Sequence, residues 1–261
     1  MATTLHLAAD GYNADLDSLG TTSILDTYFK NINPHAFSHI ISYTDPRDEE
    51  MNGITGILLA PGLHTTVHTY NHCAKACYFY DFFNYNPLLH EQSRSILEGS
   101  YKPTLYTSSY SKRDTAQRIF ETTQTAPLHY YGPHLMIRAK ADPHICQRAA
   151  FLMEDFLWKL PQLIGMHPLT KPYLVESETW LSSIRVIAES HISVHLEKAS
   201  GILYIDIFSC KKFEEYKVVE HICNTFMCTI QDVTLLYRGT HFHTQHTDTI
   251  LNALPEEVSV G

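Results

Sequence analysis

The residues of this sequence that could do chemistry gather in one stretch of thirty residues, 181–210. They are the tripeptide Glu189-Ser190-His191 together with Ser182, His195 and Cys210. Apolar and β-branched runs predict strands over 184–188, 191–196 and 203–208. Ser190 is then expected at the turn that opens a strand, where its hydroxyl can attack the carbonyl of Glu189 and convert the peptide into an ester.

Alternate side chains of a strand share one face, so His191, Ser193 and His195 should point to the same side of their sheet. His191 and His195 lack a third ligand at a sensible spacing, and we therefore expect hydrogen-bonded histidines and no metal.

Ser182, Ser190, His195 and Cys210 have a spacing that resembles the self-processing motif of the S-adenosylmethionine decarboxylases, in their short prokaryotic form. The segment GPHLMIRA, residues 132–139, resembles the start of that family. The resemblance covers about residues 131–239 and is specific because four polar residues keep the family's spacing, whereas a single Glu-Ser-His tripeptide would be weak.

The resemblance implies a chain that cleaves itself after Glu189 by β-elimination and leaves Ser190 as a pyruvoyl cofactor. His195 would take the α-proton of Ser190, and Ser182 would donate a hydrogen bond to the tetrahedral intermediate. Cys210 would reprotonate the α-carbon of the substrate, so its thiol should be protonated and partly buried. The products would be residues 1–189 and 190–261, and no separate cofactor would be needed.

The sequence also contains a repeat. Residues 5–29, 56–68 and 78–83 align in pattern with residues 133–157, 183–195 and 203–208, at offsets of 128, 127 and 125. We interpret residues 1–110 as a degenerate copy, 111–129 as a polar linker, and 130–261 as the self-processing copy. In the first copy Leu63 stands in the place of Ser190, whereas Thr55 and His68 match Ser182 and His195.

Each copy should form a strand, an amphipathic helix (17–31; 143–160), three or four short strands, a second helix (213–226 in the second copy) and a last strand. This order predicts an α+β fold in which helices cover one face of an antiparallel sheet and leave the other face apolar. Two such units would bury those faces together, giving a four-layer αββα sandwich and a pseudo-dimer within one chain.

The resemblance implies a small-molecule substrate, in the first place S-adenosylmethionine, whose decarboxylated product serves spermidine biosynthesis. The family usually follows the histidine with an aromatic residue, a proline and a glutamate, whereas this chain has HLEKA at 195–199. Some members act on L-ornithine or L-arginine, which leaves these basic amino acids as alternatives, and an inactive regulatory homologue as a further one. Candidate substrate-binding residues are Tyr70 and His72 of the first copy and Glu197.

Composition restricts the partners. The formal charge is −9, and no basic run could replace the counterions of a nucleic acid. No basic, apolar leader or apolar stretch of membrane-spanning length occurs, and six cysteines are too few for a disulfide scaffold. We expect a cytoplasmic protein without nucleic-acid or membrane partners, and leave further oligomerisation open.

Overall fold

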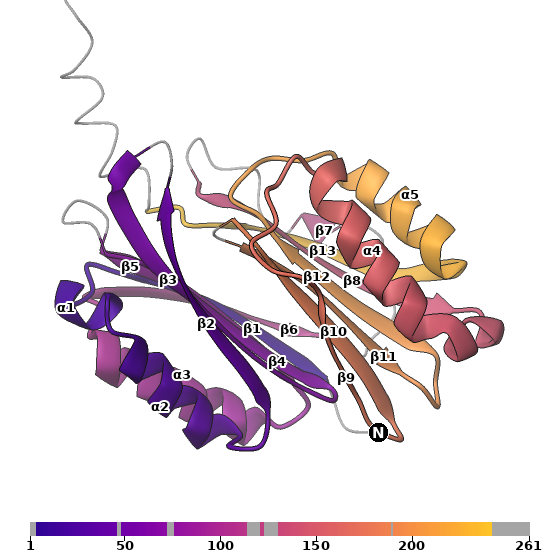
Figure 1. The fold of residues 1–261 in the computed structure, drawn as a ribbon, viewed down its shortest axis with the longest axis horizontal. Coiled ribbons are helices and arrows are strands. Elements are labelled where there is room, and N and C mark those ends of the chain that lie inside the picture. Colours follow the sequence, from indigo (N-terminus) through magenta and orange to yellow (C-terminus); the bar gives the residue numbers. More distant parts are fainter. Residues whose placement is uncertain are drawn as a thin grey trace, which may run out of the picture.

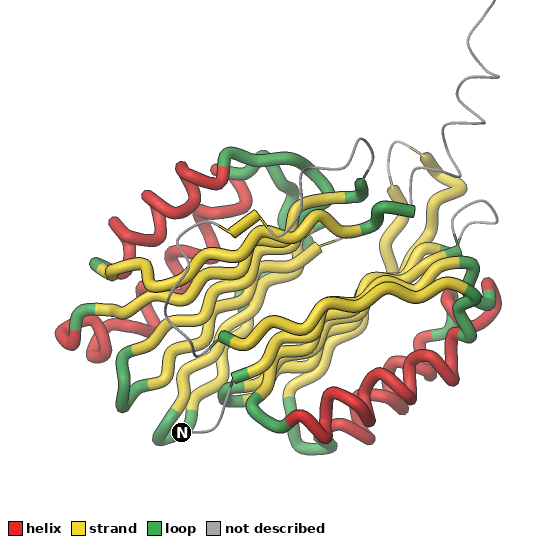
Figure 2. Tube along the Cα trace, turned by 180° about the vertical axis from the view of Figure 1, so that it is seen from behind, coloured by secondary structure: helices red, strands yellow, loops and turns green. Residues whose placement is uncertain are grey.

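Two twisted sheets pack face to face, and helices cover the outer face of each (Figure 1). The structure is a computed structural model that describes residues 4–45, 48–71, 76–113, 121–122, 130–188 and 190–241. The view from behind shows the same order of layers, helix, sheet, sheet, helix (Figure 2). The α+β class and the four-layer αββα sandwich are therefore confirmed.

The first sheet has six antiparallel strands in the order β2-β3-β4-β5-β1-β6. They are β1 (Leu5–Tyr12), β2 (Phe37–Asp45), β3 (Asp48–Ala60), β4 (Leu63–Tyr70), β5 (Cys77–Asn84) and β6 (Leu105–Lys112). Its helices are α1 (Leu16–Leu19), α2 (Thr22–Ile32) and α3 (Pro87–Tyr101). The helix predicted over 17–31 is thus divided in two, with Gly20 as the C-cap of the first turn.

The second sheet has the order β7-β13-β8-β12-β11-β10-β9, and all its pairs are antiparallel except β7 with β13. The strands are β7 (Glu121–Thr122), β8 (Gly132–Ala141), β9 (Tyr173–Glu176), β10 (Trp180–Ile187), β11 (Ser190–Glu197), β12 (Ile202–Phe208) and β13 (Cys228–Arg238). A 3-10 helix (Pro143–Arg148) precedes α4 (Ala149–Leu163), and α5 is Glu215–Phe226.

The two sheets share one topology. Strands β9, β10, β11, β12, β8 and β13 follow each other in space as β2, β3, β4, β5, β1 and β6 do in the first sheet. This is the duplication that the repeat predicted. The first sheet extends to Lys112, and the next residue, Arg113, is buried although it belongs to the segment that we interpreted as a linker.

The face between the sheets differs from our prediction. Apolar residues of each sheet pack beneath its own helices, whereas the strand positions that alternate with them are mixed: smaller apolar clusters join the two sheets, and many polar side chains lie between these clusters. The buried polar side chains include His6, Asp10, Thr55, His64, Thr66, His68, Asp81, His134, Ser182, Ser193, His195 and Asp206. The expected apolar interface is therefore present only in part. Because buried polar groups are costly unless paired, the polar side chains of the two sheets must form hydrogen bonds or ion pairs with one another.

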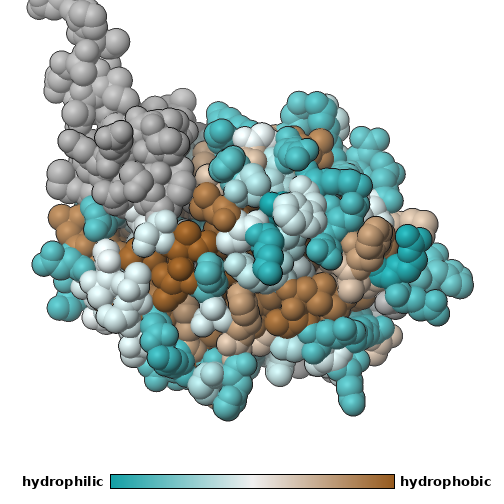
Figure 3. Space-filling model, viewed as in Figure 1, coloured by the Kyte–Doolittle hydropathy of each residue, from teal (hydrophilic) through white to brown (hydrophobic). Residues whose placement is uncertain are grey.

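The outer surface is mixed. Hydrophilic residues dominate the helical layers in the view of Figure 1, with hydrophobic residues gathered in a band across the middle (Figure 3). No helix of the described residues combines the length and the apolar character needed to cross a bilayer.

Candidate active site between the two sheets

Ser190 opens strand β11, as predicted. Strand β10 ends at Ile187, which pairs with Ser190 across the antiparallel ladder, so the two strands are joined by a two-residue connection. The Ser190 hydroxyl is fully buried and has no hydrogen-bond partner in the described part of the chain. Cys210 is half-buried, as expected, and its thiol donates to the carbonyl of Ala188 over 3.6 Å. The connection that contains the predicted cleavage point thus lies next to the predicted proton donor.

An aromatic wall lies beside Cys210. Tyr70, at the end of β4, makes a hydrogen bond with Tyr131 through their hydroxyls. The wall, against which Cys210 packs, consists of Tyr12, Tyr70, Cys77, Phe79, Tyr131 and Phe208. The structure therefore brings Tyr70 and Cys210 together, from different sheets.

Ser182 and His195 are brought together with each other but not with Ser190. Ser182 Oγ lies 2.8 Å from His195 Nδ1. Five residues separate His195 from Ser190 along β11, which is roughly 16 Å at the rise of an extended strand. A direct proton transfer from Ser190 to His195 needs hydrogen-bond reach. The assignment of His195 and Ser182 to Ser190 is therefore corrected.

Ser182 and His195 instead lie near the turn between β3 and β4 of the first sheet. His195 Nε2 lies 2.7 Å from His64 Nδ1, and Ser182 Oγ accepts a hydrogen bond from the Gly62 amide at 2.9 Å. Gly62 precedes Leu63, which stands in the place of Ser190 in the first copy. We call this region the Leu63 end of the interface, and the region of Ser190, Ala188 and Cys210 the Ser190 end.

The first sheet supplies the corresponding pair at the Ser190 end. Thr55 Oγ1 lies 3.0 Å from His68 Nδ1, and His68 Nε2 lies 3.2 Å from Nδ1 of His191, the neighbour of Ser190. Thr66 Oγ1 is also 3.2 Å from His191 Nδ1. Sequence reasoning recognised Thr55 and His68 as matches of Ser182 and His195, yet gave them no role.

Each sheet thus places its histidine and hydroxyl pair near the turn of the other sheet, and the crossing of β4 and β11 explains this arrangement. His64 meets His195 and His68 meets His191, so the two strands run in opposite directions across the interface. The two contacts are related by the repeat, because residue 64 corresponds to 191 and 68 to 195. This reciprocity is that of a twofold interface, in which each copy contributes groups to the turn of the other.

His68 is a neutral imidazole at the interface. Burial lowers its pKa to about 3, against which Asp81 raises it only in part. Burial also lowers the pKa of His191 well below its usual range. Both imidazoles are therefore neutral at pH 7, and a neutral imidazole offers one acceptor nitrogen.

Glu197 lies at the far end of β11 from Ser190, seven residues away or roughly 23 Å at the strand rise. Its carboxylate accepts a hydrogen bond from Ser200 at 2.5 Å. Its assignment to the same substrate pocket as Ser190 is therefore corrected. Glu189 and His72, two further predicted site residues, lie outside the described residues.

A buried ion-pair network occupies the middle of the interface. Arg113 of the first half pairs with Asp206 of the second at 2.5 Å, and Arg238 of the second half pairs with Asp81 of the first at 2.6 Å. Burial alone would raise the pKa of Asp81, but Arg238 and then His134 lower it well below its usual range. Each copy thus neutralises a carboxylate of the other. No role for either arginine was predicted from the sequence.

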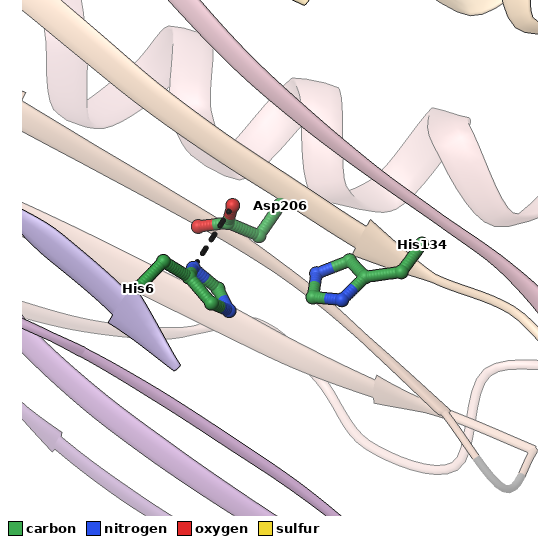
Figure 4. Close-up of side chains that lie close together, drawn as sticks. All are labelled: His6, His134 and Asp206. Carbon is green, nitrogen blue, oxygen red and sulfur yellow. Dashed lines mark ion pairs between the residues drawn. The ribbon is translucent and has the colours of Figure 1, made fainter. Parts of the chain in front are cut away.

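His6, His134 and Asp206 form the one group of three metal-ligand side chains found among the described residues (Figure 4). Their ligand atoms lie within 4.8 Å of one another. Arg113 NH1, however, is 2.5 Å from Asp206 Oδ1 and 3.5 Å from His6 Nδ1. The guanidinium therefore stands where a bound cation would be, and we assign no metal to this cluster.

Comparisons with known proteins identify relatives of the second half. A family model described as S-adenosylmethionine decarboxylase matches residues 138–239. The S-adenosylmethionine decarboxylase proenzyme of Thermococcus gammatolerans is 31% identical over 110 residues, which are 41% of this chain and 76% of that protein. The proenzyme of the same name from Pyrococcus furiosus is 28% identical over 110 residues, 41% of this chain and 78% of its own.

The crystal structure of the adenosylmethionine decarboxylase from Aquifex aeolicus is similar at 19% identity and a TM-score of 0.37, over 46% of this chain and 98% of that one. The motif around Ser190, the strands that carry it and the matched relatives agree, and the chain belongs to the S-adenosylmethionine decarboxylase family.

Proposed function

We propose that the protein is a self-processing, pyruvoyl-dependent S-adenosylmethionine decarboxylase with one active site, at the Ser190 end. The observation that carries the proposal is the buried, unpartnered hydroxyl of Ser190 at the start of β11, among the described residues, with the Cys210 thiol on the adjoining connection. The units 1–110, 111–129 and 130–261 remain our proposed division of the chain.

The processing step uses groups of both halves. The Ser190 oxygen attacks the Glu189 carbonyl carbon, the peptide nitrogen becomes an amine, and an ester joins the two residues. A base then removes the α-proton of Ser190, and the Glu189 carboxylate leaves as the ester C–O bond breaks. Hydrolysis of the remaining enamine releases ammonia and leaves a pyruvoyl group at the new terminus.

His68 is the base that we infer, since it is neutral and contacts His191, the residue that follows Ser190. Thr55 holds the His68 ring through its hydroxyl at Nδ1 and is its positioning residue. This pair takes the roles that the sequence alone assigned to His195 and Ser182.

In the mature protein, the pyruvoyl carbonyl would supply an electron sink for loss of carbon dioxide from an amino acid. Cys210 would return a proton to the substrate's α-carbon. The aromatic wall supports S-adenosylmethionine over a basic amino acid, because aromatic faces stack with a purine and attract a sulfonium cation. The product would supply the aminopropyl transfer that forms spermidine.

The proposal is tested by intact mass and by a decarboxylation assay on the same purified chain. We expect two chains, 1–189 and 190–261, with a pyruvoyl terminus on the second, and release of labelled carbon dioxide from S-adenosylmethionine but not from ornithine or arginine. Ser190→Ala should stay one chain and be inactive, whereas Ser193→Ala, a buried serine of the same strand, should still cleave. An uncleaved, inactive wild-type chain would refute the proposal and favour the inactive regulatory homologue. Release from ornithine or arginine alone would overturn the substrate assignment.

A further inference from the structure

A cavity of about 570 Å³ opens at the Leu63 end, where no serine is available for processing. Its size lies within the range of small-molecule sites. It is lined by Thr4, Tyr85, Arg138, Lys140, Trp180, Glu197, Ser200, Ile202, Tyr204 and Gln231. None of these residues belongs to the machinery assigned to the Ser190 end.

The cavity is the repeat counterpart of the Ser190 end. At the offsets of the repeat, its residues correspond to members of the aromatic wall and to their immediate neighbours. The corresponding pairs are Tyr85 with Cys210, Glu197 with Tyr70, Lys140 with Tyr12, Tyr204 with Phe79, Ile202 with Cys77 and Arg138 with Asp10. A former active-site cleft has thus kept its place in the fold while its side chains have changed.

The changes place two basic side chains in the cavity. Arg138 replaces Asp10, and Lys140 replaces Tyr12. Arg138 Nε and NH1 are buried and have no hydrogen-bond partner in the described part of the chain, nor does Gln231 Oε1. Glu197, the one carboxylate of the lining, already accepts from Ser200. A guanidinium with buried donors that lack an acceptor is costly, and an anion in the adjoining cavity would offset its charge.

The walls of the cavity suit a flat group. Trp180 and Tyr204 lie with their ring centroids 6.1 Å apart and their planes tilted by 37°, and the half-exposed Tyr85 stands at the opening. Aromatic residues of this kind bind a planar ring by stacking or edge contacts.

We propose that this cavity is a second ligand site, which binds a small anion carried on a planar aromatic or heteroaromatic ring, such as a nucleoside monophosphate or an aromatic carboxylate. Arg138 and Lys140 bind the anionic group, and Trp180 and Tyr204 hold the ring. The site binds without turnover, because Leu63 stands where the processing serine would be.

The fluorescence of Trp180, a residue of the cavity wall, can report ligand binding. The chain has two tryptophans, and Trp158→Phe leaves Trp180 as the single tryptophan. Titrations of this protein with adenosine monophosphate, adenosine and benzoate compare a phosphate, a neutral nucleoside and a carboxylate. We expect saturable quenching by at least one of the anions and binding of adenosine weaker by at least about tenfold, because the charged hydrogen bonds are lost.

Substitutions in the cavity test whether the fluorescence quenching arises from binding at this site. Arg138→Gln should weaken anion binding by about tenfold or more, and Lys140→Gln offers a second, exposed position if the first variant does not fold. Arg94→Gln, on helix α3, is the matched control and should bind like the parent. The Ser190→Ala protein should bind equally, so failure of the proposed decarboxylase activity leaves this result intact. Absence of quenching by both anions at millimolar concentration, equal binding of adenosine, or unchanged binding by both cavity variants would overturn the proposal.

Discussion

We propose that Cys210 acts in only one of the two reactions of this chain, in decarboxylation and not in self-processing. Its thiol donates a hydrogen bond to the carbonyl of Ala188, beside the proposed cleavage point, yet the acyl shift and elimination require a nucleophile and a base, not a second acid. Its proposed role, protonation of the substrate's α-carbon, requires a bound substrate.

Replacement of this thiol should therefore affect turnover and not processing. We expect Cys210→Ala to cleave normally but to release carbon dioxide about 10²- to 10⁴-fold more slowly, the usual contribution of a positioned proton donor. Cys228→Ala, which removes another half-buried thiol, is the control and should keep the wild-type rate. An unprocessed Cys210→Ala chain, or one with full activity, would contradict the role.

The family resemblance placed Ser190 and Cys210 in one site, and the Cys210 thiol, two residues beyond the end of β12, contacts the carbonyl of Ala188, two residues before Ser190. The resemblance gave no indication that His68 lies beside the segment of Ser190. His68 contacts His191, a residue 123 positions away, and this contact depends on how two sheets are superposed, which no local pattern records. The repeat held the missing information, since a twofold relation exchanges equivalent groups between the copies.

At the scale of elements, the close approach of β8 and β12 positions Cys210. Gly132 opens β8, and a Cβ built on it would lie 1.7 Å from the Ser209 carbonyl oxygen and 3.1 Å from the Cys210 Cα. The backbone of the Cys210 segment therefore depends on a residue without a side chain.

A methyl group at this position should displace that segment. We expect Gly132→Ala to lower the free energy of unfolding by about 1–3 kcal/mol, as overpacking does, and to reduce carbon dioxide release. Gly99→Ala, in helix α3 with nothing within 4 Å of the added Cβ, should instead be neutral or stabilising by up to about 1 kcal/mol. Equal effects of the two substitutions on urea unfolding would contradict this reading of the contact.

The elements themselves were largely predictable, because the strands of the second half carry apolar runs over 184–188, 191–196 and 203–208 that lie inside or within one residue of β10, β11 and β12. The polarity of the interface was not. His191, Ser193 and His195 were correctly assigned to one face, but a face that carries three polar residues in β11 alone was still expected to be apolar. The buried arginines were missed because each follows or ends the last strand of its half, outside any periodic segment.

For the whole molecule, the buried interface should make stability depend on pH. Burial lowers the pKa values of His64, His68 and His134 to about 3, whereas unfolded histidines titrate near 6.5. Below pH 6.5 these histidines bind protons in the unfolded chain but not in the folded chain, so the free energy of unfolding falls as the pH falls. His6 acts in the opposite direction, since Asp206 and Asp81 outweigh its burial and raise its pKa.

Urea unfolding at pH 7.5 and 5.5 checks this expectation. Each of the three depressed histidines should remove about 1 kcal/mol of stability over this interval. His134→Met should reduce the loss, and His35→Gln, at an exposed position, should leave it unchanged. Stability that stays constant or increases on acidification would contradict the neutral state of the buried histidines.

The reciprocal ion pairs hold the two halves together, and one of them can be tested by a double-mutant cycle. Arg113→Leu leaves Asp206 buried without its guanidinium partner, and we expect a loss of about 3–5 kcal/mol. The double variant Arg113→Leu/Asp206→Leu should recover much of that loss, because an apolar pair replaces an unpaired charge. Additive effects of the two single substitutions would show that the pair is not coupled.

The central claim is that the first half supplies the base for the serine of the second half. The most direct test is the fraction of cleaved chain, measured by intact mass over time, for His68→Asn and His195→Asn. We expect His68→Asn to be processed at least about 10²-fold more slowly than the wild type, and His195→Asn to be processed at the wild-type rate. Normal processing of His68→Asn together with blocked processing of His195→Asn would contradict it.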